Sequence, residues 1–270
     1  MDKSTRAMSP DSLATEIEHD LLSGRVPAAV IASCGSTGVT AFDPIADIVA
    51  VAAPHGIWVH VDAAMAGAAM MLPECRHLWD GVEKADSISW NPHKWMGTIL
   101  DTSLFYVRDP QHLIRVMSTN PSYLKSDVDG ESTQYRDWGI PLGRRFRSLK
   151  LWFHLYLDGA ESIRARLRRD LENAKWLAEQ VKAHSDWELV SPLTLQTVCV
   201  RHRPGNLDSA ALNEHTLKWA KLINNSGAAF LSPSQLDGEW FVRVSIGVES
   251  TQRKHVEELW QLMQDTAKEI

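Results

Sequence analysis

The chain lacks the cysteine pattern of a disulfide-stabilised or metal-binding protein. Its three cysteines, Cys34, Cys75 and Cys199, lie too far apart in sequence to form a disulfide framework or a metal-spaced pair. A long apolar run is also missing, since no stretch approaches the ~18 consecutive apolar residues of a membrane span. The N-terminus has no apolar signal-peptide core. We therefore expect reduced thiols and a cytoplasmic protein that does not enter a membrane.

Positive charge is in deficit as well. The net charge is -6 and the sequence pI is near 6.0, which disfavours binding to nucleic acid or to an anionic membrane surface. One local exception is the basic run Arg164 to Arg169, which follows a helical pattern and is flanked by acids such as Asp170. We interpret it as a solvated helix face rather than a binding patch.

What remains is an ordinary globular composition with an α/β order of elements. The 270 residues are 44% apolar and 23% charged, enough for a sizeable core. A strand, helix and strand in close succession form a βαβ unit, which predicts parallel strands with a right-handed crossover. The predicted elements of this part are helices at 9–23 and 44–54 and strands at 27–33, 57–61, 86–90 and 103–107.

The second half of the chain combines an aperiodic segment, two long helices and a region of mixed strands and helices. Residues 118–136 lack periodicity, which is typical of a functional or disordered loop. Two long amphipathic helices are predicted from Arg145 to about Lys182, broken near Gly159. We therefore divide the chain into a partial large domain over 1–182 and a small α+β domain over 183–270. Within the latter we predict strands at 187–190, 195–201, 228–231 and 240–245, and helices at 208–223 and 250–268.

The most informative segment runs from Ser87 to Met96 and reads Ser-Ile-Ser-Trp-Asn-Pro-His-Lys-Trp-Met. Pro92 removes a backbone donor and forces Asn91 toward an extended conformation, so the chain turns and directs Lys94 into a cleft. An earlier buried strand delivers Asp62 at its C-terminal end. In open α/β sheets, ligands bind at that edge.

An amine and a carboxylate at one sheet edge suit an aldehyde cofactor that carries a pyridine ring. Lys94 would form a Schiff base, and Asp62 would keep the ring nitrogen protonated, as pyridoxal phosphate requires. Plainer interpretations stay open, because most lysines are surface charges and Asp62 could cap or pair within the core. His60 and Asp62 also share one strand face, so a metal site is a competitor, although no further ligands follow at a recognisable spacing.

These residues resemble the group II pyridoxal-phosphate-dependent amino-acid decarboxylases, closest to the aromatic-L-amino-acid decarboxylases. The resemblance is carried by His-Val-Asp-Ala-Ala at 60–64 and Asn-Pro-His-Lys-Trp at 91–95, and continues through 35–37, 121–125 and 138–150. It implies a fold-type I pyridoxal-phosphate transferase-like large domain, truncated at its N-terminus, with a small C-terminal domain. It also implies the reaction, loss of the α-carboxylate of an aromatic L-amino acid to give the amine and carbon dioxide.

The resemblance assigns the cofactor-binding residues. It implies that Lys94 holds pyridoxal phosphate, that Asp62 pairs with the pyridine nitrogen, and that Ala64 packs flat on the ring. Two further residues, Asn91 and His93, are similar to those that reach the phosphate. The last of the set is Thr37, placed near the ring. Without the resemblance, Thr37 is a turn residue and His93 could equally be a satisfied core histidine.

The resemblance also assigns residues to the substrate and to a homodimer. Tyr123 matches a tyrosine on a mobile loop that closes over the neighbouring subunit's site and protonates the carbanion. Related aldehyde synthases carry Phe there, so Tyr123 predicts simple decarboxylation. Gly143 matches a substrate-binding position contributed across the dimer, where glycine favours indolic substrates such as tryptophan. Arg144, Arg145 and Arg147 are expected to form structural and interface ion pairs, with a role toward the substrate carboxylate as the alternative.

The match covers only the C-terminal part of such an enzyme. In the family, the N-terminal part supplies the histidine that stacks on the ring, most of the phosphate-binding loop and much of the substrate pocket. We therefore expect the chain as given to hold half of a cofactor site. The alternatives are a non-catalytic fragment or pseudoenzyme subunit that pairs with another chain, an aldehyde synthase, and a metal-dependent hydrolase built on His60 and Asp62.

Overall fold

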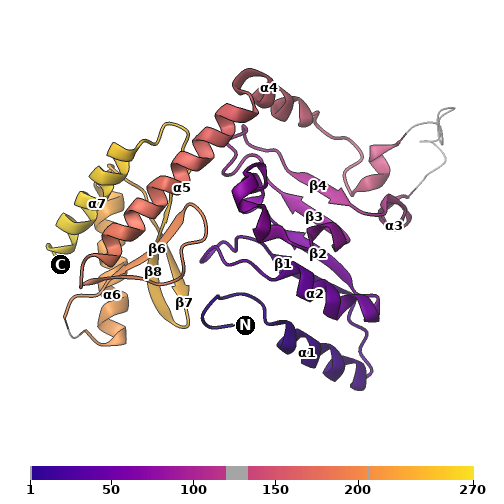
Figure 1. The fold of residues 1–270 in the computed structure, drawn as a ribbon, viewed down its shortest axis with the longest axis horizontal. Coiled ribbons are helices and arrows are strands. Elements are labelled where there is room, and N and C mark those ends of the chain that lie inside the picture. The colour runs from indigo at the N-terminus through magenta and orange to yellow at the C-terminus, as the bar shows by residue number, and fades with distance from the viewer. Residues whose placement is uncertain (1, 120–132, 206) are drawn as a thin grey trace.

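The structure is a computed structural model that describes residues 2–119, 133–205 and 207–270. It contains two four-stranded sheets, one from each half of the chain, connected by the long helix α5 (Ala160–Lys182), which runs diagonally across Figure 1. None of the helices in these described ranges is long and apolar enough to cross a lipid bilayer. The three cysteines are free and buried, and burial raises the pKa of the Cys34 thiol to about 12.

The first sheet has the strand order β1-β2-β3-β4. Strands β1 to β3 are parallel and β4 is antiparallel to β3, so the predicted βαβ unit is confirmed. Helix α1 begins as its sequence predicts, because the Ser9 side chain accepts a hydrogen bond from the Ser12 amide and Pro10 occupies the first turn. The bounds are α1 (Pro10–Leu22), β1 (Ala29–Ser33), α2 (Ile45–Ala52), β2 (Trp58–Asp62), β3 (Ser87–Trp90) and β4 (Leu104–Val107).

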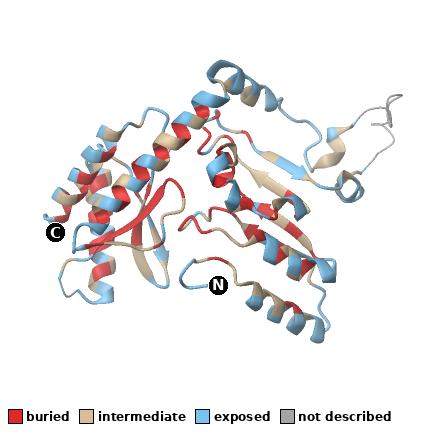
Figure 2. Cartoon of the chain, in the orientation of Figure 1, coloured by how far each residue is buried: buried red, intermediate tan, exposed pale blue. Residues whose placement is uncertain are grey.

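The two faces of this sheet have different surroundings. On one face Val59 and Val61 are buried and belong to the same core as Ile48 of α2. On the other face Ile31 is 59% exposed and Phe105 is 47% exposed, and Figure 2 shows little red on this sheet's upper strands. Within the described part of the chain, this second face is therefore largely open.

Several short elements were not predicted from the sequence. The connection from β2 to β3 is built from 3-10 helices rather than an α-helix, and Gly67 lies so close to Trp90 that an added Cβ would stand 2.3 Å from the Trp90 Cβ. Asp109 caps an unpredicted helix through the Gln111 amide. The bounds are η1 (Ala53–His55), η2 (Ala66–Met71), η3 (Pro73–Trp79), η4 (Val82–Lys84), α3 (Pro110–Met117) and η6 (Tyr135–Trp138).

The two long helices break at Gly159, as predicted, where φ is +77°. Helix α4 (Ser148–Asp158) has no buried residue, and most of it is pale blue in Figure 2. Its Trp152 and Tyr156 rings stack at 4.9 Å, although their residues are 52% and 72% exposed. Helix α5 is different, because it contributes Leu167 to the first core and Leu177 to the second.

The second sheet is antiparallel, with the order β5-β6-β8-β7. It packs with α5, α6 and α7 in one core and confirms the α+β character predicted for this region. The bounds are β5 (Trp187–Leu189), β6 (Thr197–His202), α6 (Ser209–Asn225), β7 (Ser232–Leu236), β8 (Glu239–Ser245) and α7 (Arg253–Ala267).

One strand prediction is wrong. The run 228–231 is not a strand, and β7 lies immediately after it. The position of β7 is set by the hairpin turn that follows it. Asp237 and Gly238 have φ angles of 52° and 84°, which suit a tight two-residue connection, and this turn pairs Leu236 with Glu239. Strand β7 tolerates Pro233 because it lies at the edge of the sheet.

Candidate active site

Strands β2 and β3 end side by side at the carboxyl edge of the first sheet. The Ala63 amide donates to the Ser89 carbonyl at 2.9 Å, and the Asn91 amide donates to the Ala64 carbonyl at 3.0 Å. The parallel pairing therefore continues past the last residue of β2. As a result, the segments that carry Asp62 and Lys94 leave the sheet together, at the edge where open α/β sheets bind ligands.

Asp62 presents a carboxylate at this edge. Its Oδ1 atom accepts the Ala64 amide at 2.9 Å, which fixes the orientation of the carboxyl group. Its residue is exposed, and the Oδ2 atom has no partner among the residues that the structure describes. The Asp62 side chain thus offers one oxygen to a cationic or N–H group outside the sheet, and Ala64 is small enough to leave space beside it.

The turn that carries Lys94, residues 91–98, is held by three backbone hydrogen bonds. The Lys94 amide donates to Asn91, the Gly97 amide to Lys94 and the Thr98 amide to Pro92, each at 3.0 Å. Gly97 has a φ of +86°, a conformation that favours glycine. The Lys94 side chain itself is exposed and has no partner within the described residues. The backbone of this turn is therefore fixed while its amine stays available.

His93 is fixed by Thr102. Its Nδ1 atom lies 2.7 Å from the Thr102 carbonyl oxygen and 3.0 Å from the Thr102 nitrogen. Within the described chain, the Nε2 atom has no partner. Asn91 is half-buried beside it, with its backbone already committed to the strand pairing. His93 and Asn91 therefore both stand where β3 leaves the sheet, as the sequence predicts.

Thr37 lies on a turn that reaches the same edge. The Cys34 amide donates to the Asp62 carbonyl at 2.8 Å, which brings the turn after β1 beside the end of β2. Gly35 has a φ of +80°, and an added Cβ would stand 2.4 Å from the Ala66 Cβ. Thr37 is exposed on this turn, so three consecutive strand ends contribute predicted cofactor-binding residues.

His60 is engaged within the sheet. Its Nδ1 and Nε2 atoms lie 2.8 Å and 3.2 Å from the hydroxyl oxygens of Ser87 and Ser89. Burial lowers the pKa of His60, and the nearby Asp62 charge opposes that shift. Both ring nitrogens are thus used, and the described residues contain no group of three or more His, Cys, Asp or Glu that could hold a metal ion. The hydrogen bonds of both ring nitrogens favour a structural role for His60 within the sheet.

Behind the lysine turn lies a buried ion pair that the sequence interpretation missed. Arg166 and Asp170, on successive turns of α5, are 8% and 0% exposed, so the prediction that this helix face is solvated is wrong for these two residues. The sequence spacing does indicate this burial, because Arg166 and Asp170 lie on the same face of the helix as the apolar residues Ile163 and Leu167. Their contacts to Trp95 are described below.

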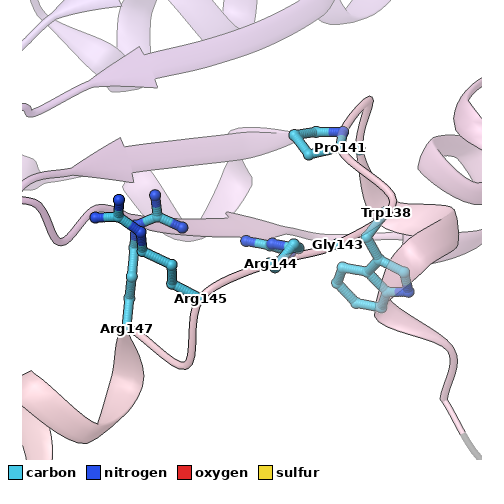
Figure 3. A pocket seen from close by; sticks show the side chains of 7 residues that line it. Trp138, Pro141, Gly143, Arg144, Arg145 and Arg147 are labelled. Atoms are coloured by element: carbon cyan, nitrogen blue, oxygen red, sulfur yellow. The ribbon is translucent and has the colours of Figure 1, made fainter.

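Gly143 lines a pocket that shares no residue with the strand ends described above. The pocket has a volume of about 380 Å³, and a Cβ built on Gly143 would meet nothing within 4 Å. Figure 3 shows Trp138 at one end of this segment and the Arg145 and Arg147 side chains at the other. Arg147 pairs with Asp101 at 3.0 Å and holds the pKa of that carboxyl at about 2. The pocket lining is Trp138, Gly139, Pro141, Gly143, Arg144, Arg145 and Arg147.

The other predicted residues have mixed outcomes. Arg147 makes the structural ion pair expected of it, whereas Arg144 and Arg145 are exposed and have no ion pair among the described residues. Tyr123 lies outside the described residues. The structure therefore gathers six of the predicted residues at the sheet edge, namely Thr37, Asp62, Ala64, Asn91, His93 and Lys94, and places Gly143 on a separate pocket.

Comparison with known proteins gives a consistent result. The family described as the pyridoxal-dependent decarboxylase conserved domain matches residues 2–203. Phenylacetaldehyde synthase of Arabidopsis thaliana is 40% identical over 98% of this chain and 55% of its own length. Tryptophan decarboxylase 2 of Oryza sativa subsp. japonica is 36% identical over 98% of this chain and 54% of its own length. The chain thus spans about half the length of the curated relatives it matches.

Solved structures agree with the sequence relatives. The crystal structure of Oryza sativa TDC with PLP and tryptamine has a TM-score of 0.93 and 36% identity, and covers 97% of this chain and 55% of its own. The structure of Rhodiola rosea 4-hydroxyphenylacetaldehyde synthase has a TM-score of 0.90 and 34% identity, over 98% of this chain and 54% of its own. The described architecture is therefore shared with both.

Proposed function

The chain belongs to the pyridoxal-dependent decarboxylase family, and on that basis we propose that it carries the lysine-bearing part of an enzyme that decarboxylates an aromatic L-amino acid. The products are the amine and carbon dioxide. The fold-type I architecture and the family resemblance predicted from the sequence are confirmed. The observation that carries the proposal is the hydrogen bond from the Asn91 amide to the Ala64 carbonyl, which joins the Lys94 and Asp62 segments at one edge.

The residues at this edge fit pyridoxal phosphate. Lys94 offers an amine with no partner in the described structure, which suits the aldehyde, and the Asp62 Oδ2 atom is open to a ring N–H. For the phosphate, the candidates are the side chains of Asn91, His93 and Thr37. A phosphate dianion needs several donors to offset its desolvation, so this set holds it only in part.

Each residue has a distinct role in the proposed mechanism. When bound, the cofactor supplies an electron sink for the electron pair that is released as carbon dioxide leaves. Lys94 would supply the amine that holds the aldehyde carbon of the cofactor. Asp62 keeps the pyridine nitrogen protonated, because a carboxylate beside that nitrogen raises its pKa. Ala64 leaves space for the flat face of the ring.

Two residues act on the substrate in this proposal. Tyr123 delivers a proton to the substrate carbon after carbon dioxide has left, and it lies outside the described residues. Gly143 provides space for an indole ring, since the pocket beside it is open. In this proposal Gly143 faces the active site of the partner in a homodimer. A cytoplasmic location is part of the same proposal.

A second candidate is an aldehyde synthase. The relative that favours it is the Arabidopsis thaliana phenylacetaldehyde synthase, at 40% identity. Such a reaction would consume molecular oxygen and water, and would release the aldehyde, ammonia, hydrogen peroxide and carbon dioxide in place of the amine and carbon dioxide. The presence of Tyr123 rather than Phe is the reason to prefer simple decarboxylation.

The third candidate is a non-catalytic subunit that pairs with another chain. The open face of the first sheet, with Ile31 and Phe105 exposed, is consistent with a partner segment. In this case the fold is kept and turnover depends on the partner.

A chimaera separates the three candidates. The N-terminal part of the rice tryptophan decarboxylase, which this chain does not span, would be joined before Met1 and supplied with pyridoxal phosphate and L-tryptophan, L-tyrosine or L-dopa. Amine with equimolar carbon dioxide supports decarboxylation. Aldehyde with oxygen uptake supports the second candidate. A folded chimaera that binds cofactor and releases neither product supports the third and contradicts our proposal.

A further inference from the structure

The residue that follows Lys94 is held at two points by one helix. The Trp95 indole N–H donates to the Asp170 Oδ2 atom at 3.0 Å, and the Trp95 carbonyl oxygen accepts from the Arg166 Nη2 atom at 3.1 Å. We infer that Arg166 and Asp170 are positioning residues for Lys94, which set where its amine stands at the sheet edge. This inference rests on the proposed function, because it takes Lys94 as the cofactor-binding amine.

Arg166 completes the hydrogen bonding of the lysine turn. The three backbone bonds within 91–98 leave the carbonyl groups of Trp95 and Met96 without backbone partners. Buried carbonyl groups of this kind need a donor. Arg166 supplies it, since its Nη2 atom donates to both oxygens. The end of the turn is therefore closed by a side chain from α5 instead of by its own backbone.

Asp170 fixes the donor and the indole together. It is fully buried, and its Oδ2 atom lies 3.6 Å from the Arg166 Nη1 atom as well as 3.0 Å from the Trp95 nitrogen. A buried carboxylate is costly unless it is paired and hydrogen-bonded. Here the Trp95 donor and the Arg166 cation offset part of that cost, while the Asp170 Oδ1 atom has no hydrogen-bond partner among the described residues and burial raises the pKa of the carboxyl. Movement of either Trp95 or Arg166 would remove an interaction from the buried Asp170 carboxylate.

The same indole contacts the C-terminal half of the chain. An added Cβ on Gly247, just beyond β8, would stand 3.1 Å from the Trp95 Cδ1 atom, so the backbone there approaches the ring directly. On the same helix, Arg169 donates to the Glu249 carbonyl, and Arg253 donates to the Asn173 side chain at 2.9 Å. The lysine turn is thus seated against α5 and the loop after β8 together.

This arrangement suits a lysine whose backbone must be fixed while its side chain remains free. Trp95 and Met96 are 3% and 1% exposed, whereas Lys94 is exposed. Binding of a ligand by the Lys94 amine then costs little conformational entropy, because the backbone is already fixed and only the side chain has to be ordered. The ion pair acts through Trp95 and does not touch the reacting atoms.

The experiment uses the 270-residue chain and two readouts. The first is the hydrogen-exchange rate of the Lys94, Gly97 and Thr98 amides, compared with the exchange rate of amides in strand β6, which lies in the core. The second is the rate at which pyridoxal phosphate with borohydride labels Lys94, mapped by peptide mass spectrometry. The variants are Trp95→Phe, Arg166→Gln and Asp170→Asn, with Arg166→Lys as the conservative rescue.

Loss of a charge-assisted hydrogen bond speeds local opening on the order of tenfold or more. We therefore expect the amides of the lysine turn to exchange at least about tenfold faster in Trp95→Phe and Arg166→Gln than in the wild-type chain, while the exchange rate of the β6 amides stays the same. The rate at which Lys94 is labelled should also differ from that of the wild-type chain. Arg166→Lys should restore part of the protection. The matched control is Arg168→Gln on the same helix, which breaks only the exposed ion pair with Glu74 and should leave both readouts unchanged.

Two outcomes overturn the inference. One is equal acceleration in the turn and in β6, which would make the ion pair a general stabiliser. The other is unchanged exchange and labelling in Trp95→Phe, the variant least disruptive to the fold. Failure of the proposed function gives a different result. The wild-type chain would then carry its label on a lysine other than Lys94, whereas the exchange rates of the turn amides would still respond to the variants.

Discussion

The Nδ1 atom of His202 lies 2.9 Å from the Nε2 atom of His215, and both residues are buried between β6 and α6. Burial, followed by the neighbouring His215, lowers the pKa of His202 to about 4 from an ordinary value of 6.5. Burial also lowers the pKa of His215, with Lys218 adding to the shift. A proton on either ring would place a cation in a site that also holds the Trp187 ring, 4.6 Å from His202.

This pair predicts that the protein loses stability in mild acid. Between pH 6.5 and 4 the unfolded chain binds a proton at His202 that the folded chain does not. The free energy of unfolding is therefore highest above pH 6.5 and falls as the pH is lowered toward 4, by on the order of 3 kcal/mol. Urea denaturation at several pH values measures it. His202→Gln should flatten the curve and His55→Gln, an exposed control, should not; equal slopes in all three proteins would contradict the assignment.

A second prediction concerns Lys94. In the chimaera with the rice N-terminal part, Lys94→Ala should abolish the visible absorbance of bound pyridoxal phosphate and the label fixed by borohydride, because no other amine follows Asn91 and Pro92 at the sheet edge. Absorbance and peptide mapping check this. Lys84→Ala, on the exposed helix η4, is the control and should keep both signals. A label on another lysine would refute the role of Lys94.

Tyr123→Phe should leave cofactor binding intact and shift the product from amine to aldehyde. The reason is that the tyrosine hydroxyl protonates the substrate carbon before oxygen reacts with it, and Phe has no proton to give. Product ratio and oxygen uptake in the same chimaera measure the change. Tyr106→Phe on β4 serves as the control. Amine output that stays at the wild-type level, without aldehyde, would remove Tyr123 from the mechanism.

The chain without a partner segment should bind pyridoxal phosphate weakly. Asn91, His93 and Thr37 offer too few donors to offset the desolvation of a phosphate dianion. A spectroscopic titration should show little stoichiometric binding, and tryptophan, tyrosine and dopa should release no carbon dioxide. Tight one-to-one binding with turnover would show that the residues described here form a complete site.

Helix α4 should mediate self-association. Its stacked Trp152 and Tyr156 are largely exposed, and burying an aromatic side chain is worth about 1.5–3 kcal/mol. Trp152→Ser should therefore weaken a dimer about tenfold or more in sedimentation experiments. Leu22→Ser removes an apolar side chain that is 89% exposed on α1 and should have no effect. A wild-type chain that remains monomeric at high concentration would contradict the proposed homodimer.

The elements with strong local signals could be predicted from the sequence. Ser9 and Pro10 mark the start of α1, and Gly159 marks the break before α5, because capping and left-handed backbone are local properties. The hairpin at Asp237 and Gly238 has an equally local signal, but the predicted strand 228–231 ends before the strand that leads into this turn begins. The 3-10 helices between β2 and β3 have no comparable signal and depend on close packing such as that of Gly67.

The site could be predicted only in part. Motif order and strand ends were enough to bring Asp62 and Lys94 to one edge, since parallel strands end together. The burial of Arg166 and Asp170 could not be read from their charges, which predict solvent exposure. Their helical spacing with Ile163 and Leu167 does indicate a buried stripe, but only the contact from Trp95 to Asp170, across 75 residues of chain, shows what the pair packs against.

The shared helix α5 has a consequence for how the chain unfolds. Leu167 packs in the core of the first sheet and Leu177 in that of the second, on a helix whose backbone hydrogen bonds are continuous. Melting either core removes packing that stabilises the helix for the other. We therefore expect the two halves to unfold as one cooperative unit, and a cut at the boundary that we predict near residue 183 to destabilise both.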